Sequence, residues 1–308
     1  MLLGIYYSPE TSLICNYEEG GAYLEKVVAI LGAGIMGAGI AQVTAQSGYY
    51  VILRDLQLSL VKEGLRLINE NLEQQVEDSI IKPQMKEEIL NRIQITTEFT
   101  KVKEADLIIE SVVENMAVKK QLFNELDNIC SKDAILASNT TTLSISEIAA
   151  ATKYKGRILG LHFHNPVSKT ELVEIIKGYE TSDDAVKEAR EYIRRINKRS
   201  IVLEHETPGY IVNRILFPFI NEAISMYFEG VASCETIDKA AQLTLNMSKS
   251  PLALADEIGL DYLHSSLLYF YEELKDPKYL PHQYFTTMVK AGYWGKKTGS
   301  GFYDYEKT

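Results

Sequence analysis

The chain has 308 residues, with 32 lysines and arginines against 42 aspartates and glutamates, so its formal net charge is −10. At about 100–200 residues per domain, this length and a hydrophobic content of 46% predict two domains with sizeable cores. The apolar stretches are shorter than the ~18 residues that a membrane span needs, and the acidic balance disfavours nucleic-acid binding.

Residues 1–25 are predicted to be an N-terminal extension that precedes the first strand. The first positive charge of the chain is Lys26, which follows this extension, and Ser8-Pro9-Glu10 interrupts the apolar start of the extension. We therefore do not expect a secretory signal. The three cysteines of the chain are far apart and show no CxxC spacing, which predicts a reducing, cytoplasmic compartment and no metal site. These cysteines are Cys15, Cys130 and Cys234.

Strand-like and helix-like segments alternate from Val27 to about residue 205. Val27–Leu31 is a short apolar run, and a helical stretch follows it to Gln46, with Gly48 suited to the C′ position. A second apolar run begins at Tyr50 and ends at Leu53, and a long amphipathic segment then extends to about Ile80. This alternation predicts an α/β, Rossmann-type domain with a mainly parallel sheet covered on both faces. Further strands are predicted at 93–96, 107–109, 135–137 and 158–163, and a helix at 116–129.

After residue 205 the pattern changes to helix-length segments with no alternating strand. Thr207 is a suitable N-cap, and Pro208 suits the first helical position because its missing N–H would have no partner there. We therefore predict a dinucleotide-binding domain over 26–205 and an all-α substrate and dimerisation domain over 206–308. Its helices are expected at about 209–229, 234–246, 251–272 and 281–291.

The first predicted strand continues directly into a glycine-rich loop, Gly32-Ala33-Gly34-Ile35-Met36-Gly37. This GxGxxG stands between a strand and a helix, where its backbone can approach a pyrophosphate that rests on the helix N-terminus. Asp55 ends the second strand, 23 residues beyond Gly32, where a carboxylate accepts hydrogen bonds from ribose hydroxyls and repels a 2′-phosphate. This strand–loop–helix unit with Asp55 predicts NAD rather than NADP as the cofactor. The neighbouring Arg54 argues in part against this, because its cation could tolerate the 2′-phosphate of NADP.

A predicted hairpin brings a histidine and a glutamate together. If residues 158–163 and 171–176 pair antiparallel around Ser168, opposed positions sum to 336, so His162 faces Glu174. The carboxylate would fix one imidazole nitrogen and leave the other as a general base, although a purely structural pair is equally compatible with the pattern. We expect His164 on the opposite face of the strand. His164 is therefore predicted to be structural, as are His205, His264 and His282.

Taken together, these residues resemble the L-3-hydroxyacyl-CoA dehydrogenase family over about residues 26–306. The resemblance rests on the glycine loop, on the His162 to Glu174 hairpin and on four further motifs, which follow one another in the order that the family shows. These are Val113-Glu114-Asn115, Ser138-Asn139-Thr140, Thr207-Pro208-Gly209-Tyr210-Ile211-Val212-Asn213-Arg214 and Gly295-Lys296-Lys297-Thr298-Gly299-Ser300-Gly301-Phe302-Tyr303.

The resemblance implies an NAD-dependent enzyme of fatty-acid-type metabolism that oxidises a 3-hydroxyacyl thioester, with its active site between an NAD domain and a helical dimerisation domain. His162 matches the family's general base and Glu174 its carboxylate partner. Ser138 and Asn213 match the residues that hold and orient the substrate hydroxyl. Four further residues match positions that contact the nicotinamide half of NAD or close on it: Glu114, Lys119, Asn165 and Lys297.

Two departures from the family concern the acyl carrier. Residues 56–80 hold two cations against five acids, a net charge of −3, where the family usually presents lysines or a serine to the CoA phosphates. Lys249-Ser250-Pro251-Leu252 replaces the usual Met-Gly-Pro. Three hypotheses follow: a short-chain 3-hydroxyacyl-CoA substrate, a short hydroxyacyl group on an acyl carrier protein, and a catalytically inactive NAD-binding dimer.

Overall fold

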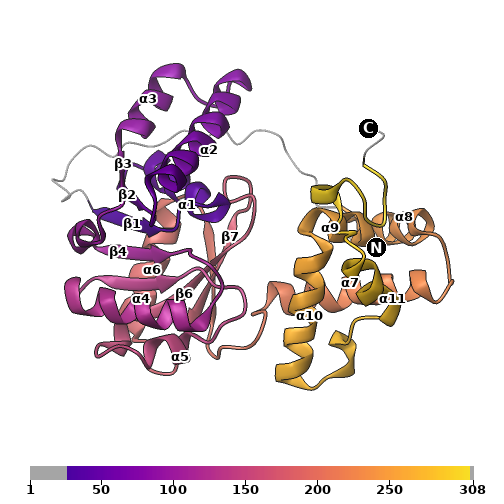
Figure 1. The fold of residues 1–308 in the computed structure, drawn as a ribbon. Helices are drawn as coiled ribbons and strands as arrows, with labels where there is room; N and C mark the ends of the chain where they lie inside the picture. The colour runs from indigo at the N-terminus through magenta and orange to yellow at the C-terminus, as the bar shows by residue number, and fades with distance from the viewer. Residues whose placement is uncertain (1–25, 306–308) are drawn as a thin grey trace, which may run out of the picture.

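The computed structural model describes residues 26–305, which form a sheet-containing part and a helical part side by side (Figure 1). The predicted extension over 1–25 and Cys15 lie outside the described residues. Within that range no helix is both long enough and apolar enough to cross a membrane.

One eight-stranded sheet organises the first part, in the order β3-β2-β1-β4-β5-β6-β7-β8. Neighbouring strands are parallel except for β6 and β7, which form an antiparallel hairpin, and β8 pairs parallel with β7. The order of the first six strands is that of dinucleotide-binding sheets, in which ligands bind beyond the carboxyl ends of β1 and β4. The strands are β1 (Val27–Leu31), β2 (Tyr50–Arg54), β3 (Ile93–Thr96), β4 (Leu107–Glu110), β5 (Ile135–Ser138), β6 (Ile158–Phe163), β7 (Leu172–Lys177) and β8 (Arg199–Leu203).

Helices cover both faces of this sheet, as strands buried on both sides require. The face carrying Ile30 and Leu53 packs against α1, α2, α3 and α6, and the face carrying Leu31 and Ile108 packs against α4 and α5. These helices are α1 (Ile35–Gln46), α2 (Leu58–Glu77), α3 (Pro83–Asn91), α4 (Met116–Ile129), α5 (Ile145–Ala149) and α6 (Asp183–Arg195), with short 3₁₀ turns η1 (Phe99–Glu104) and η2 (Lys155–Arg157).

The helical part has its own core around Phe217, Phe270 and Phe285. The chain enters it after β8 and closes on a C-terminal turn, where the buried Asp256 carboxylate accepts hydrogen bonds from the backbone N–H groups of Phe302 and Tyr303, both 2.9 Å. Its elements are α7 (Val212–Phe228), α8 (Cys234–Leu245), α9 (Pro251–Ile258), α10 (Leu260–Leu274), η3 (Pro277–Tyr279), α11 (Gln283–Lys290) and η4 (Lys296–Thr298).

The predicted fold class, a Rossmann-type sheet followed by an all-α part, is confirmed. Two local predictions are wrong. Thr207 does not cap a helix, because α7 begins at Val212 and residues 207–210 form a turn in which Tyr210 N–H donates to the Thr207 carbonyl. The expected helix at 251–272 is two helices, because Gly259 adopts a φ of +99° that ends α9 before α10 begins.

Candidate active site

The glycine loop lies at the carboxyl end of β1 and against the end of β4. A Cβ added at Gly32, whose φ is +100°, would approach the Ser111 carbonyl oxygen to 2.3 Å, so only glycine fits there. A Cβ at Gly34 would meet nothing within 4 Å, which leaves open space above the backbone. No side chain caps the N-terminus of α1, and Ile35 beside it is 67% exposed, whereas Met36 is half-buried. A diphosphate therefore fits this open helix N-terminus.

Asp55 lies beside this loop, just past the end of β2. Its Oδ2 accepts a hydrogen bond from Ala33 N–H at 2.7 Å, and its Oδ1 accepts one from Leu56 N–H at 2.6 Å. These bonds fix the carboxylate next to the open helix terminus, at the position where the sequence places an acid for the ribose of NAD.

The hairpin register predicted from the sequence is confirmed, since His162 on β6 is opposite Glu174 on β7. His162 Nδ1 lies 2.7 Å from Glu174 Oε2, and the two side chains are 6% and 0% exposed. The other carboxylate oxygen, Oε1, accepts hydrogen bonds from Ile211 N–H at 2.9 Å and Val212 N–H at 3.1 Å. Glu174 thus holds the histidine and the start of α7 together, so the pair lies where the sheet meets the helical part.

The electrostatics of this pair keep the imidazole neutral and the carboxylate charged. Burial lowers the pKa of His162 and outweighs the hydrogen bond that its ring donates to Glu174, which acts to raise that pKa. Burial acts to raise the pKa of Glu174, but its hydrogen bond with His162, the nearby His164 ring and the backbone N–H of Ile211 bring that pKa down to about 2. A neutral imidazole with one nitrogen bound to an anion is ready to accept a proton on the other nitrogen.

The placement of His164 on the opposite face of the strand is wrong. Its Nε2 lies 3.3 Å from Glu174 Oε2, and its ring centroid is 4.4 Å from that of His162. Side chains two residues apart share a face of a strand, so the period of the strand places both histidines against Glu174.

Ser138 lies at the end of β5, in a buried polar group that includes a residue the sequence interpretation missed. Its Oγ donates a hydrogen bond to Glu110 Oε2 at 2.6 Å, and Lys119 Nζ lies 2.5 Å from Glu110 Oε1. All three residues are fully buried. Glu110 ends β4 in direct register with Ser138, and an acid closing an apolar strand beside a predicted site serine is the signal that could have identified it.

Glu114 and Lys119 also belong to this region. Lys119 Nζ lies 3.4 Å from Glu114 Oε2, and the Glu114 Oε1 accepts hydrogen bonds from the Thr140 hydroxyl and from Thr141 N–H at 3.0 Å. Burial acts to raise the pKa of Glu114, yet the charge of Lys119 and these hydrogen bonds hold it below its ordinary value. Glu114 is thereby fixed as an anion between the loop after β4 and the loop after β5.

The remaining predicted site residues lie at different places. Asn213 is 8% exposed in the first turn of α7, next to Val212, which donates to Glu174. Asn165 is exposed just after β6 and precedes the cis peptide bond to Pro166. Lys297 lies in η4 of the helical part, with its Nζ 2.5 Å from Asp261 Oδ1, and so contacts a residue of its own part.

Tyr210, to which we assigned no role from the sequence, packs on His162 with ring centroids 5.3 Å apart.

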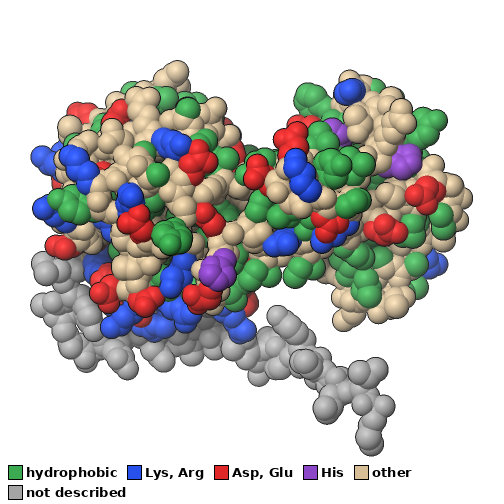
Figure 2. All heavy atoms as spheres, turned by 90° about the horizontal axis from the view of Figure 1, so that it is seen from below, with side chains coloured by type: hydrophobic (Ala, Val, Ile, Leu, Met, Phe, Trp, Pro, Cys, Tyr) green, Lys and Arg blue, Asp and Glu red, His purple; other side chains and the backbone are tan. Residues whose placement is uncertain are grey.

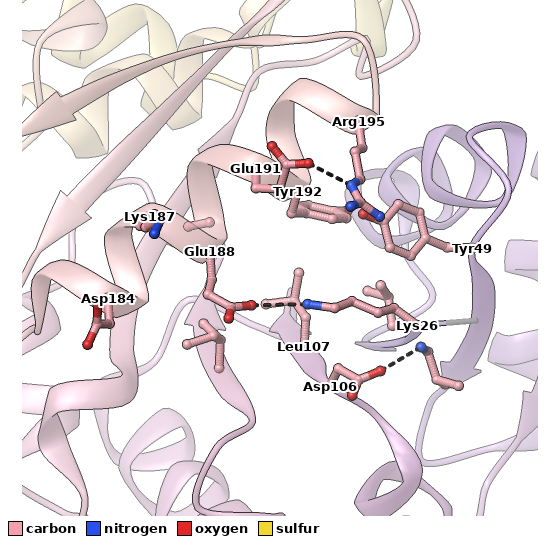
Figure 3. Close-up of a pocket in the computed structure, with 14 residues that line it drawn as sticks. Lys26, Tyr49, Asp106, Leu107, Asp184, Lys187, Glu188, Glu191, Tyr192 and Arg195 are labelled. Carbon is pink, nitrogen blue, oxygen red and sulfur yellow. Dashed lines mark hydrogen bonds and ion pairs between the residues drawn. The ribbon is translucent and has the colours of Figure 1, made fainter. Parts of the chain in front are cut away.

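A separate cavity of about 440 Å³ lies at the opposite edge of the sheet, beside the first residues of β1, β4 and β5 (Figure 3). Two of its charged side chains pair with each other, since Lys26 Nζ lies 3.1 Å from Glu188 Oε2, and Asp106 accepts a hydrogen bond from Val27 N–H at 2.9 Å (Figure 3). None of the catalytic candidates His162, Glu174, Ser138 and Asn213 lines this cavity, so it is not their site.

Comparison with known proteins agrees with this geometry. Residues 27–207 match the model of the 3-hydroxyacyl-CoA dehydrogenase NAD binding domain, and residues 209–305 match that of the 3-hydroxyacyl-CoA dehydrogenase C-terminal domain. A 3-hydroxybutyryl-CoA dehydrogenase of Clostridioides difficile is 43% identical over 280 residues, covering 91% of this chain and 99% of that protein. The human mitochondrial hydroxyacyl-coenzyme A dehydrogenase is 36% identical, over 91% of each chain.

A solved structure gives the same result in three dimensions. The crystal structure of (S)-3-hydroxybutyryl-CoA dehydrogenase from Ralstonia eutropha matches with a TM-score of 0.88 and 39% identity. The match covers 91% of this chain and 99% of that one, and therefore includes both the sheet and the helical part.

Proposed function

Because this chain belongs to the 3-hydroxyacyl-CoA dehydrogenase family, we propose that it oxidises a short-chain 3-hydroxyacyl-CoA to the 3-oxoacyl-CoA with NAD, using His162 as the general base. The observation that supports this most is the buried His162–Glu174 pair, 2.7 Å apart, at the carboxyl edge of a sheet that carries a dinucleotide loop. Oxidation of a hydroxyl group needs a base for the O–H proton as hydride leaves the carbon, and this pair supplies one.

The protein's part in the reaction follows from the same contacts. His162 Nε2 accepts the proton of the substrate hydroxyl, and Glu174 stabilises the imidazolium that forms on the other side of the ring. Ser138 and Asn213 hold that hydroxyl in line, with Ser138 itself oriented by Glu110. NAD, held by the glycine loop and Asp55, supplies the acceptor for the hydride that leaves C3.

The acyl carrier that we propose is CoA, since the relatives are named for CoA substrates. Two cations in this region are paired with acids: Arg66 bonds Glu63 and Glu70 on α2, and Lys86 of α3 bonds Glu73. Lys249 likewise pairs with Glu257. The pairs of Arg66 and Lys249 are exposed and cost little to open, so these two side chains are able to turn to phosphates.

A carrier comparison tests this proposal. The rate of NADH oxidation is measured with acetoacetyl-CoA and with the same acyl group on an acyl carrier protein, at equal concentrations. We expect a kcat/KM at least about tenfold higher on CoA. A higher value on the carrier protein would replace the CoA proposal with the biosynthetic alternative, and no NADH oxidation on either carrier would favour the inactive dimer.

We further propose a cytoplasmic homodimer that associates through a helical domain beginning at 205–207. Exposed large apolar side chains on this part support an interface: Ile215 is 69% exposed, Leu243 75% and Leu245 56%. The two-domain boundary is supported by the gap between the last strand, which ends at Leu203, and α7, which begins at Val212.

Cofactor choice should change when the charge of Asp55 is removed. Asp55→Asn keeps an oxygen for the Ala33 N–H but loses the negative charge that would repel a 2′-phosphate. A charge interaction at about 4 Å near a surface is worth roughly 1–4 kcal/mol, so the ratio of kcat/KM for NADP to that for NAD should rise at least about tenfold. Asp133→Asn, an exposed control, should leave the ratio unchanged. An equal ratio in Asp55→Asn and the wild type would count against the assigned role.

Substitutions of Ser138 and of its buried partner Glu110 should differ in how far they lower activity and how far they lower the free energy of unfolding. Ser138→Ala removes one hydroxyl and should lower kcat/KM by about 10–100-fold, because hydrogen bonds in such sites contribute about 1.5–3 kcal/mol. It also leaves the buried Glu110 Oε2 without its donor and should lower the free energy of unfolding by about 1–3 kcal/mol. Glu110→Gln leaves Lys119 without its closest counter-charge in a fully buried site and should lower the free energy of unfolding by about 3–5 kcal/mol. Steady-state kinetics and thermal unfolding of both variants check this contrast, which fails if Ser138→Ala retains full activity.

A further inference from the structure

His164 is a partly buried titratable residue beside the site, and the proposed reaction does not use it. Its Nε2 has no hydrogen-bond partner within the described residues, although it lies 3.3 Å from Glu174 Oε2. A buried nitrogen without a hydrogen bond costs free energy, and such a group is accordingly retained where another ligand can use it.

Three donor atoms converge at this point. His162, His164 and Glu174 each present one ligand atom, and these atoms all lie within 4.8 Å of one another. Zinc binds imidazole nitrogens and carboxylate oxygens at about 2.0–2.2 Å, so ligand atoms in one site lie no more than about 4 Å apart. The separations between these atoms are at most 4.8 Å, so a movement of the rings by less than about an ångström brings all three atoms within reach of one ion.

The charge and the access at this cluster suit a divalent cation. Two imidazoles and one carboxylate carry a single negative charge when the rings are neutral, and imidazole with carboxylate is a donor set typical of zinc. Glu174 Oε1 is held by the backbone N–H groups of Ile211 and Val212, so Oε2, which lies 2.7 Å from His162 Nδ1 and 3.3 Å from His164 Nε2, is the oxygen that faces both rings. The His164 side chain is 17% exposed, against 6% for His162, so the route from solvent runs along His164.

We propose that His162, His164 and Glu174 form a binding site for Zn²⁺, and that occupation of this site switches the enzyme off. As the ion binds His162 Nδ1, the proton of Nδ1 moves to Nε2 of the same ring, so Nε2 no longer has a lone pair to accept the substrate proton. The cysteines play no part in this site. The inhibition rests on the proposed function of His162, whereas the binding of zinc does not.

His164→Asn tests the proposal, because asparagine is polar and smaller than histidine but offers no imidazole ligand. Zinc binding is measured at pH 7.5 on the full-length protein by competition with a chromophoric chelator, using Zn²⁺ as the only added metal. NADH oxidation with acetoacetyl-CoA is followed in parallel, with and without EDTA. His205→Asn, at an exposed histidine, is the matched control.

The wild type should bind one Zn²⁺ per chain at this site and lose turnover as zinc is added, with full recovery on EDTA. His164→Asn should weaken both effects at least about tenfold, since loss of even an outer ligand contact typically costs 10–100-fold in metal affinity, and His205→Asn should behave as the wild type. Equal zinc affinity in His164→Asn and the wild type would overturn the proposal. So would a wild type that binds no zinc, whether or not it oxidises NADH, because the binding assay is independent of turnover.

Discussion

Replacing His162 with glutamine should lower kcat for oxidation of a 3-hydroxyacyl-CoA by about 10²–10⁴-fold, the usual contribution of a positioned general base. Glutamine keeps a polar side chain beside Glu174 but has no nitrogen that can accept a proton. The glycine loop and Asp55 are untouched, because they lie at the ends of β1 and β2, while His162 is on β6. The Kd of NADH should therefore stay within about twofold of the wild type.

His205→Gln is the matched control for this substitution, since His205 is exposed. Its kcat should equal that of the wild type. Fluorescence titration with NADH and a steady-state assay give the two quantities separately. Full turnover in His162→Gln would remove His162 as the base, while a loss of NADH binding together with turnover would show that the change disrupted the cofactor site instead.

Glu174→Gln should reduce kcat by about 10³-fold although it changes one atom. The carboxylate accepts a hydrogen bond from His162 Nδ1, which leaves the lone pair on Nε2 for the substrate proton. An amide group has an N–H to offer, and donating it to Nδ1 would move the ring proton to Nε2, where it blocks the base. The amide oxygen can still accept from Ile211 and Val212, so the fold should remain intact.

Glu174→Ala supplies the comparison that separates chemistry from structure. It leaves the two backbone N–H groups at the start of α7 without their acceptor and should therefore lower the free energy of unfolding by roughly 1–3 kcal/mol for each group. Thermal unfolding of Glu174→Gln close to that of the wild type, with Glu174→Ala well below it, is the expected pattern. An active Glu174→Gln would show that the carboxylate is only a structural partner.

The hairpin shows why part of the site was predictable from the sequence. Its register depends on a turn between two apolar runs, and a period of two then places His162 opposite Glu174. The same period argues that His164 shares the face of His162, and the opposite placement went wrong by ignoring it. Regular elements therefore carry positional information that extends to the side chains at their ends.

The role of Glu110 and the start of α7 were harder to predict from the sequence. An acid at the end of a strand is usually expected to lie in solvent. Glu110 is instead buried against Ser138 and Lys119, because β4 aligns with β5 and the helix after β4 carries Lys119. Thr207-Pro208 has the composition of a helix start, but the chain turns at Tyr210 with a φ of +55°, and Glu174 holds the first N–H groups of α7 from another strand. Tertiary contacts decided both positions, and the local sequence offered only the acid at the end of β4 as a signal.

The association of the two parts follows from contacts of this kind. Besides the Glu174 bonds, the Tyr269 hydroxyl of α10 donates to the Thr142 carbonyl in the loop after β5 at 3.2 Å. The space-filling view shows two lobes joined by a narrower middle (Figure 2). His162 bonds Glu174, and Glu174 bonds the backbone of Val212, which precedes Asn213. Both predicted site residues therefore lie near this junction, where we propose that the substrate contacts them.

The central claim is that this chain uses the His162–Glu174 pair to transfer hydrogen between NAD and a 3-hydroxyacyl thioester. The most direct measurement is the consumption of NADH with acetoacetyl-CoA by the wild type and by His162→Gln at equal enzyme concentration. The account predicts that the wild type consumes one NADH per acetoacetyl-CoA and that His162→Gln is slower by at least about 10²-fold. Equal rates in the two proteins, or no consumption by the wild type, would contradict it.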